Sequence, residues 1–314
     1  MPQISFEFFS PKTISAAFSL SRAVESLAEF APRFSSVTCS NDPAQTLDTL
    51  RALRRSGLGR LQAHITCATQ TPADLPAYLK AVQEAGAEGI VALRGDTAPK
   101  GLEVMDLIGC AKKNAMQDIF VAAYPEAHPL AQSAQSDLDW LKRKQDAGAT
   151  AAITQFFFHA DFFLRFRDKA AAQGVTLPII PGILPVQNWT STQTIARSCA
   201  TAIAPDLAEG FARAEREGRT KMMAIAQATE LCDNLIQNGV EHLHFYTMNK
   251  AEVVCAICTA LGKAPQQSLH SVALSPPCAT LGLVKTAAQE ARNDTGERFF
   301  GFTHPRATAF DVRL

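Results

Sequence analysis

Six polar residues follow one another along the chain at intervals of about 30 residues, each at the end of a short, apolar, β-rich run. They are Glu7, Thr38, His64, Asp96, Tyr124 and Gln155. A carboxylic acid, an imidazole and an amide can transfer protons and hydrogen-bond a flat heteroaromatic ligand. Because about 30 residues is the length of one strand and one helix, parallel strands would bring all six to one rim.

Glu7 stands in the run Phe6-Glu7-Phe8-Phe9, where strand geometry points it away from Phe6 and Phe8. If that side is the interior of a barrel, lost solvation raises the pKa of the carboxyl and suits a general acid near neutral pH. If it is the outer side, Glu7 is an ordinary surface glutamate. The alternation alone leaves both readings open.

Asp96 and Gln155 each end an apolar run in a different way. The run from Ile90 stops in Arg94-Gly95-Asp96, where the arginine favours an ionised carboxylate that could bind an NH-rich ring. The same aspartate could simply close a turn. Gln155 precedes three phenylalanines, so its amide lies beside stacking surfaces, although a buried glutamine bonded to its neighbours fits equally.

A loop with two prolines follows Tyr124 and contains His128, and a helical stretch with Asp137, Arg143 and Lys144 comes next. Asp137 and Lys144 are seven residues apart, which places them on one side of a helix. Phosphate or ribose contact is one interpretation of this charged side. A solvated, salt-bridged helix face is the other.

Eight β-rich runs, each followed by an amphipathic helical stretch, predict the elements that position these residues. The expected strands are residues 4–9, 35–39, 62–67, 89–94, 119–124, 152–158, 179–184 and 242–248. Between the last two there is room for three helices, at about 191–203, 206–217 and 219–238, which we expect to form a wall over a substrate. The helix start and stop signals include Asp42-Pro43, Thr71-Pro72, Ser133 and Gly148.

The fold class predicted is therefore α/β, a (β/α)8 TIM barrel with extra helices between strands 7 and 8 and a C-terminal extension. Residues 1–262 would form the catalytic barrel. Residues 263–314 would form an extension that packs on the barrel or on a partner subunit.

Composition favours a protein that acts on small molecules. The chain has 314 residues, 47% of them hydrophobic, with 30 basic and 30 acidic residues and no net charge. That balance argues against extended capture of nucleic acid or of an anionic membrane. The N-terminus lacks a signal peptide and no apolar run could span a bilayer, so we expect a cytoplasmic protein with reduced cysteines.

The cysteine and histidine spacings do not predict a metal site. Cys255 and Cys258 are the only close cysteine pair, and they fall in a helical pattern without a second pair. His242 and His244 would share one face of a strand, where structural roles fit better than metal binding. The glycine-rich fingerprint GxGxxG is absent, so any dinucleotide is held without a Rossmann unit.

Seven segments with distinctive sequences follow one another along the chain. They are FEFFSP from Phe6, ALRGD from Ala92, AYPEAHP from Ala123, LKRKQDAGA from Leu141, ITQFFF from Ile153, PGILP from Pro181 and FYTMN from Phe245. In this order they closely resemble methylenetetrahydrofolate reductase in its bacterial single-domain form. The resemblance covers about residues 3–262.

The resemblance implies a βα barrel that carries FAD, takes hydride from NADH or NADPH and reduces 5,10-methylenetetrahydrofolate to 5-methyltetrahydrofolate. It implies that Glu7 protonates the folate, that Asp96 holds the pterin and influences the flavin, and that Gln155 contacts folate and nicotinamide. Lys250 would offer a cation to the glutamate tail of the folate. The implied flavin contacts are Thr38, His64, Arg94, Gly95, Asp96, Tyr124, His128, Asp137, Arg143 and Lys144.

Three departures from the family pattern all fall on flavin contacts. They are the short connection after Thr38, the short loop between Asp96 and Glu103, and Trp140 where a polar side chain is common. Two alternatives therefore stay open, namely direct hydride transfer from NAD(P)H to the same folate without flavin, and a non-catalytic folate-binding barrel subunit. We expect folate and a nicotinamide nucleotide as partners, and a homo-oligomer is left open.

Overall fold

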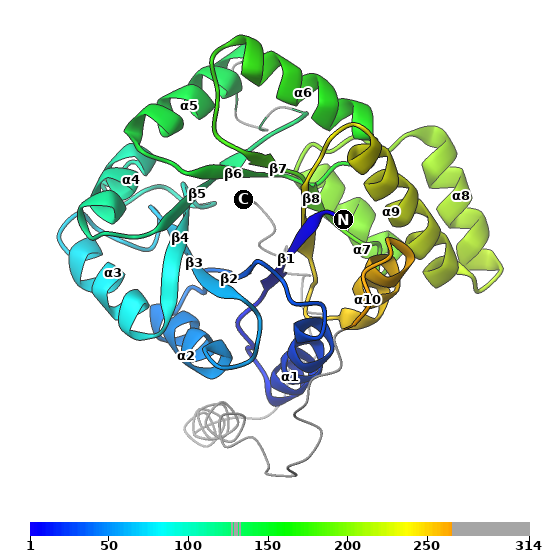
Figure 1. The fold of residues 1–314 in the computed structure, drawn as a ribbon, viewed down its shortest axis with the longest axis horizontal. Helices are drawn as coiled ribbons and strands as arrows, with labels where there is room; N and C mark the ends of the chain where they lie inside the picture. Colours follow the sequence, from blue (N-terminus) through cyan, green and yellow to red (C-terminus); the bar gives the residue numbers. More distant parts are fainter. Residues whose placement is uncertain (127, 129–130, 132, 266–314) are drawn as a thin grey trace, which may run out of the picture.

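A computed structural model describes residues 1–126, 128, 131 and 133–265. They form a ring of strands surrounded by helices (Figure 1). The predicted α/β barrel is therefore confirmed. Most of the predicted C-terminal extension, residues 266–314, lies outside the described residues.

All the strand pairs of the described residues are parallel, and the sheet has the order β7-β6-β5-β4-β3-β2-β1-β9-β8. Parallel pairing puts every strand's carboxyl end on the same side of the ring. The strands are β1 Gln3–Phe8, β2 Phe34–Val37, β3 Arg60–Thr66, β4 Ala87–Leu93, β5 Asp118–Ala123, β6 Ala151–Thr154, β7 Ile179–Ile180, β8 Gly182–Ile183 and β9 His242–Tyr246.

The seventh expected strand is divided by Pro181 into β7, which pairs with β6, and β8, which pairs with β9, so the ring closes across this proline. Proline has no N–H to donate, but its carbonyl accepts from the N–H of His244 at 3.0 Å. A Cβ at Gly182 would lie 2.2 Å from the Thr154 carbonyl oxygen, so only glycine fits. The Tyr246 hydroxyl donates to that same oxygen at 2.6 Å, which joins β9 to β6.

The helices begin and end close to the predicted signals. Asp42 caps α2, Ser133 caps α5, and Gly148 ends α5 in the left-handed conformation. The third helix begins later than Thr71-Pro72 predicted, because its N-cap is Asp74. The helices are α1 Ile14–Ala28, α2 Pro43–Leu53, α3 Leu75–Glu84, α4 Val104–Lys113, α5 Ala134–Ala147, α6 Ala160–Ala172, α7 Trp189–Ser198, α8 Pro205–Arg216, α9 Thr220–Gln237 and α10 Ala251–Ala260.

The three helices predicted between the seventh and eighth strands are present as α7, α8 and α9. Trp189 of α7 stacks on Phe211 of α8, with ring centroids 4.5 Å apart. Figure 1 shows α8 on the outside of the ring, beside α9, rather than over its centre. The connection before α8 reaches the mouth, where the N–H of Ala202 donates to the Glu126 carboxylate at 2.8 Å. These helices therefore form a layer at the side of the barrel, and not the predicted wall over a substrate.

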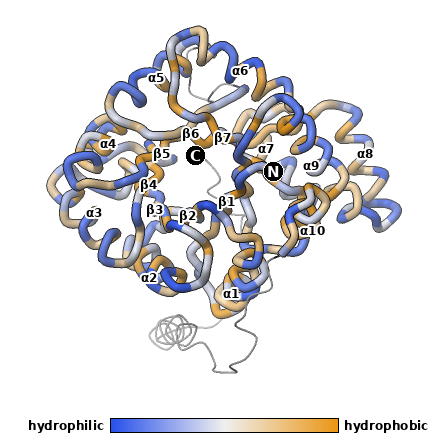
Figure 2. The backbone as a smooth tube through the Cα atoms, in the orientation of Figure 1, coloured by the Kyte–Doolittle hydropathy of each residue, from blue (hydrophilic) through white to orange (hydrophobic). Residues whose placement is uncertain are grey.

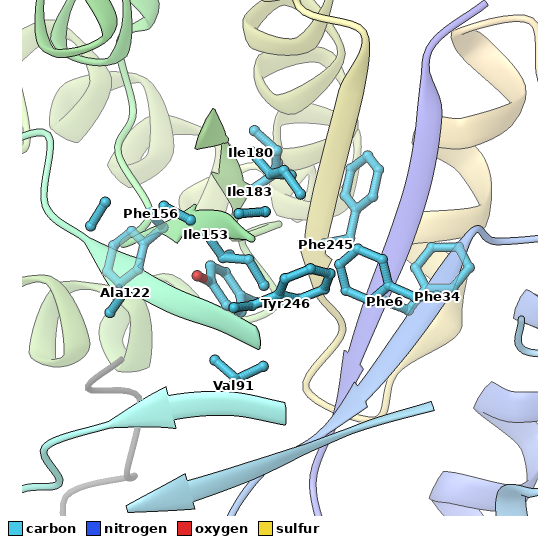
Figure 3. Close-up of a cluster of buried hydrophobic side chains, with 14 of the residues drawn as sticks. Phe6, Phe34, Val91, Ala122, Ile153, Phe156, Ile180, Ile183, Phe245 and Tyr246 are labelled. Atoms are coloured by element: carbon cyan, nitrogen blue, oxygen red, sulfur yellow. The ribbon is translucent and has the colours of Figure 1, made fainter. Parts of the chain in front are cut away.

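The apolar core lies between the strands and the helix ring. Hydrophobic residues concentrate along β5 to β7, and the outer sides of the helices carry hydrophilic segments (Figure 2). Between β1 and β9, Phe6 and Phe245 pack with ring centroids 6.3 Å apart (Figure 3). This burial fixes the strand register, since slipping by one residue would exchange the apolar and polar sides of β1.

No described helix has both the length and the apolar character needed to cross a bilayer. Within the same residues, His, Cys, Asp and Glu side chains form no group of three that could hold a metal ion.

Candidate active site

Glu7 faces the interior of the ring near the carboxyl ends of the strands. Its side chain lines a cavity together with His64, and only 3% of the residue is exposed. The reading of Glu7 as a surface glutamate is therefore wrong. Its neighbours Phe6 and Phe8 pack on the other side of β1, as the alternation of a strand requires.

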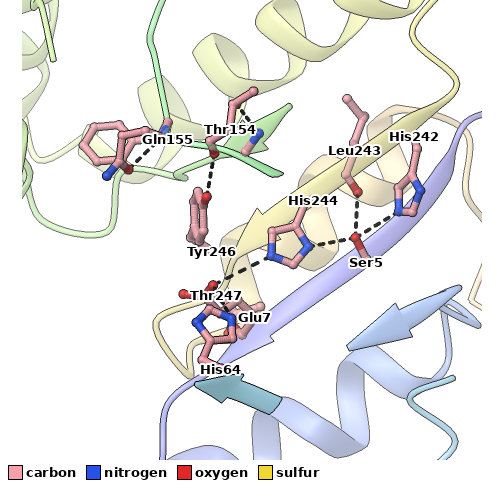
Figure 4. Close-up of polar contacts among 12 residues, drawn as sticks. Ser5, Glu7, His64, Thr154, Gln155, His242, Leu243, His244, Tyr246 and Thr247 are labelled. Atoms are coloured by element: carbon pink, nitrogen blue, oxygen red, sulfur yellow. Dashed lines mark hydrogen bonds and ion pairs between the residues drawn. The ribbon is translucent and has the colours of Figure 1, made fainter. Parts of the chain in front are cut away.

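Two imidazoles approach the Glu7 carboxyl (Figure 4). The Nε2 atoms of His64 and His244 lie 3.3 and 3.8 Å from its Oε2 atom. Neither contact has hydrogen-bond geometry, and these three buried atoms have no other hydrogen-bond partner among the described residues. The contacts are therefore electrostatic, and the Glu7 and His64 atoms, whose side chains line the cavity, stay available to a ligand.

Burial controls the protonation of this group. Loss of solvation raises the pKa of Glu7 to about 7, and the nearby His64 opposes that rise. Burial lowers the pKa of His64, and it lowers the pKa of His244 to about 3. Near neutral pH the carboxyl can thus hold a proton while both imidazoles are neutral. That combination is the requirement for a general acid.

The residues that hold the end of β1 fix Glu7 in place. The Thr247 hydroxyl donates to the Glu7 carbonyl at 2.6 Å. The Asn249 side chain accepts from the N–H of Phe9 and donates to its carbonyl, both at 2.9 Å. Sequence reasoning did not assign this clamp, although both side chains belong to the FYTMN segment.

The cavity that Glu7 lines has a volume of about 230 Å³ and opens at the barrel mouth. Thr38, His64, Gly95 and Asp96 also line it. Gly95 has a φ of 86°, and a Cβ there would lie 2.9 Å from the Cβ of Ala68. Glycine is therefore needed to bring the Asp96 loop to the rim.

A larger cavity, of about 750 Å³, lies beside the first between the ends of β4 and β5 and the helices α4 and α5. The two cavities share Leu93. The predicted flavin contacts that line the larger one are Arg94, Tyr124, His128, Asp137 and Lys144. A ligand that occupied both cavities would run from the rim of the barrel toward Glu7.

The polar side chains that line the larger cavity also contact one another and the backbone. The ammonium of Lys144 donates to the Ala122 carbonyl at 2.8 Å, and burial lowers its pKa to about 8. Asp137 accepts from the N–H of His128 at 2.7 Å, and burial raises the pKa of Asp137. The rings of Tyr124 and His128 meet edge to face, 4.5 Å apart. This wall offers a cation, an acid and an aromatic edge to a ligand.

Three of the predicted site residues do not line either cavity. Arg143 is exposed, and its guanidinium lies 4.2 Å above the Trp140 ring. Gln155 is 4% exposed, and its side-chain oxygen accepts from the N–H of Phe156 at 3.0 Å. Tyr246 lies between Gln155 and Glu7 in Figure 4. Lys250 is exposed at the start of α10.

The larger cavity suits a flavin dinucleotide in size and in chemistry. Its volume falls within the usual range for sites of small molecules and cofactors. Arg94 and Lys144 supply cations for phosphate groups, and the half-exposed face of Trp140 can stack on an aromatic ring. The residues present therefore fit the cofactor that the sequence resemblance implies.

The fold and this site place the chain among the α/β barrels that work at the carboxyl ends of their strands. Within that class, residues 1–262 match the family model for methylenetetrahydrofolate reductase, and the chain belongs to this family. The resemblance predicted from the seven segments is confirmed.

Curated relatives agree with this assignment. The chain is 40% identical over 271 residues to 5,10-methylenetetrahydrofolate reductase of Escherichia coli (strain K12), covering 83% of this chain and 91% of the relative. It is 30% identical over 283 residues to methylenetetrahydrofolate reductase (NADH) 1 of Arabidopsis thaliana, covering 82% of this chain and 48% of that protein.

A solved structure shares the fold. It is a protein from Clostridium thermocellum that binds two copies of 5-methyl-5,6,7,8-tetrahydrofolic acid. The TM-score is 0.60 at 15% identity, covering 82% of this chain and 94% of the other.

Proposed function

We propose that this chain reduces 5,10-methylenetetrahydrofolate to 5-methyltetrahydrofolate, with NADH or NADPH as hydride donor and FAD as the bound carrier. Family membership and the names of the relatives support the reaction. The observation that carries the mechanism is the buried Glu7 carboxyl, whose pKa of about 7 lets it hold a proton beneath the barrel mouth.

The reaction adds one hydride and one proton to the substrate. Glu7 donates the proton to a folate nitrogen, the five-membered ring opens, and the exocyclic carbon becomes an iminium that accepts the hydride. Asp96 lies on the rim of the same cavity, where its carboxylate accepts hydrogen bonds from the pterin. Because the cavity is small and its floor is buried, a bound pterin excludes water from Glu7.

FAD, when bound, supplies the transfer of hydride from the nicotinamide to the folate. In this proposal Arg94 and Lys144 bind its phosphates, and Asp137, Tyr124 and His128 orient it along the larger cavity. The remaining contacts assigned to it are Thr38, His64, Gly95, Asp96 and Arg143. Gln155 contacts folate and nicotinamide in turn, and Lys250 offers its charge to the folate tail outside the mouth.

The decisive experiment separates the two half-reactions under anaerobic conditions. Glu7→Gln keeps the size of the side chain and removes its proton-donating acid. We expect flavin reduction by NAD(P)H at the parental rate and loss of methylenetetrahydrofolate reduction by about a hundredfold or more. Equal loss of both half-reactions in a folded variant would reject Glu7 as the acid.

A second candidate keeps the reaction but passes hydride directly from the nicotinamide nucleotide to the folate. The stacking of Arg143 on Trp140 favours it, because this contact holds an assigned flavin ligand outside the cavity. An absorbance spectrum of the purified protein, before and after anaerobic NADH or NADPH, distinguishes the two. Bleaching of a bound flavin supports the first proposal, and a colourless active protein supports the second.

A further inference from the structure

The inside of the barrel carries an unusual column of polar side chains beneath Glu7. Parallel pairing of β1 with β9 sets Ser5 opposite His244 and Glu7 opposite Tyr246. Because side chains alternate along a strand, Ser5 and Glu7 of β1 share the interior with His242 and His244 of β9. Barrel interiors are usually filled with branched apolar residues, so this column needs an explanation.

These side chains form a continuous path (Figure 4). The Ser5 hydroxyl lies 2.8 Å from Nδ1 of His244 and 2.9 Å from Nε2 of His242. The other ring nitrogen of His244, Nε2, lies 3.8 Å from Oε2 of Glu7. Each imidazole thus uses one nitrogen toward Ser5. The second nitrogen of His244 points up the path, toward the acid.

The path ends at the opposite side of the barrel from the mouth. His242 is the first residue of β9 and is only half-buried, whereas His244 is fully buried. Phe34 of β2 packs against both imidazoles, with ring centroids 5.4 and 5.5 Å away. This ring packs against the two histidines and holds them in line.

We propose that Ser5, His242 and His244 form a proton path that recharges Glu7 from the N-terminal side of the barrel. The proposal rests on the proposed function, in which Glu7 loses one proton in every turnover. A pterin or nicotinamide bound over the small cavity blocks the direct route from the mouth. A route from below lets Glu7 regain its proton while the mouth is occupied.

The transfer balances without charged histidines. His244 gives its Nε2 proton to the Glu7 carboxylate and takes one at Nδ1 from the Ser5 hydroxyl. Ser5 takes a proton from Nε2 of His242, and His242 takes one from water at the N-terminal face. The net change is one proton moved from water to Glu7. It leaves each imidazole with its proton on the other nitrogen, so both tautomers must be reset before the next transfer. The 3.8 Å step exceeds a hydrogen bond, so the Glu7 carboxyl must turn from His64 toward His244.

The electrostatic surroundings favour transfer through neutral imidazoles. The pKa of both histidines of the path is lowered to about 3, mainly by burial, and the nearby His244 contributes to the shift of His242. Arg33 and Lys263 face His242 and act in the same direction. At the upper end, Glu7 meets His64 and Tyr246. No site on the path therefore traps a proton as a stable imidazolium near neutral pH.

The test compares the first turnover with the later ones. In Ser5→Ala, Glu7 starts protonated at pH 6.5, so the first methyltetrahydrofolate per enzyme should form at the parental rate in rapid-quench experiments. Later turnovers wait for reprotonation, so kcat should fall by about tenfold or more and show a larger solvent deuterium isotope effect. His242→Phe, at the half-buried end of the path, should behave in the same way.

Ser35→Ala is the matched control. Ser35 is equally buried on the adjacent strand, but its hydroxyl donates to the Leu58 carbonyl and is not part of the path. Ser35→Ala should change neither the rate of the first turnover nor kcat. Parental kcat in folded Ser5→Ala overturns the proton path, and so does a first turnover slowed as much as the later ones, since that would mean that Ser5 positions Glu7.

A second measurement separates this proposal from the proposed function. The carboxylic C=O band of Glu7, assigned by its loss in Glu7→Gln, shifts when its proton exchanges in D2O. With 5-methyltetrahydrofolate added, Ser5→Ala should slow this exchange and Ser35→Ala should not. Slowed exchange without any turnover would keep the path and reject the reaction. Unchanged exchange would reject the path, whatever the enzyme catalyses.

Discussion

Oε2 of Glu7 lies 3.3 Å from Nε2 of His64, and the two residues are only 3% and 2% exposed. Burial disfavours the charged form of both residues, because it raises the pKa of the acid and lowers the pKa of the imidazole. The neutral pair is thereby favoured over the ion pair. A proton is held on the carboxyl, close to where a substrate would bind.

The pH profile of folate reduction follows from this pair. Only protonated Glu7 donates, so the rate should be constant at low pH and fall about tenfold per unit as pH rises above about 7. Stopped-flow reduction of methylenetetrahydrofolate by pre-reduced enzyme measures it. The NAD(P)H half-reaction should lack this break. A folate half-reaction that stays flat from about pH 6 to 9 would contradict the assignment.

His64 tunes the same break. The imidazole stabilises the Glu7 carboxylate electrostatically and so opposes the rise in its pKa; His64→Leu should therefore raise that pKa and move the break in the folate half-reaction to higher pH. Thr66→Val changes a neutral side chain of the same cavity and should leave the position of the break unchanged. A shift to lower pH in His64→Leu would show that His64 stabilises the protonated carboxyl rather than the carboxylate.

The rim of the barrel was predictable from sequence because the physical signal is local. Short apolar runs that end in Glu7, His64 or Asp96 recur with the period of one strand and one helix, and parallel strands put those ends on one side. The division of the seventh strand was not predicted, since the pairing of Gly182 depends on the distant Thr154 and Tyr246.

Gly95→Ala should disturb the loop that carries Asp96. The φ of 86° disfavours any side chain, and the new Cβ would also meet the Cβ atoms of Ala68 and Thr66 at 2.9 and 3.0 Å. We expect a loss of roughly 1 to 3 kcal/mol in the free energy of unfolding and weaker folate binding. Gly218→Ala separates the two causes, because φ is 67° there and no atom lies within 4 Å. Equal losses would mean that backbone strain alone accounts for the effect.

Lys144→Met should weaken flavin binding. Lys144 places a partly desolvated cation in the larger cavity, so its loss should raise the dissociation constant of FAD by about tenfold or more. Flavin fluorescence titration of the apoprotein measures this constant. Lys142→Met is the control, because Lys142 lies on the same helix and pairs with Asp146 outside the cavity. Equal affinity in both variants would count against Lys144 as a flavin contact.

The interior column shows where reading the sequence reaches its limit. His242 and His244 were expected on one face of a strand, and the structure puts them there. Their pairing with Ser5 could not be predicted, because β1 and β9 are the first and last strands in the sequence. They become neighbours only when the ring of strands closes. Alternation also could not decide which side of β1 faces inward, so the environment of Glu7 stayed open until the register was known.

The cost of keeping Glu7 buried should be measurable as stability. Its pKa is higher in the folded protein than the ordinary 4.5, so the folded state binds the proton more tightly than the unfolded chain. The parent therefore loses stability as pH rises from 4.5 to about 7, whereas Glu7→Gln does not titrate. Across that interval the free energy of unfolding of Glu7→Gln should rise relative to that of the parent by roughly 3 kcal/mol at most. Above about pH 7 the difference should stay constant. Urea unfolding at several pH values tests this, with Glu84→Gln as the control for an exposed carboxylate. If Glu7→Gln were stabilised relative to the parent only below pH 4.5, the pKa of Glu7 would be lowered and not raised by folding. That result would refute a protonated, buried Glu7.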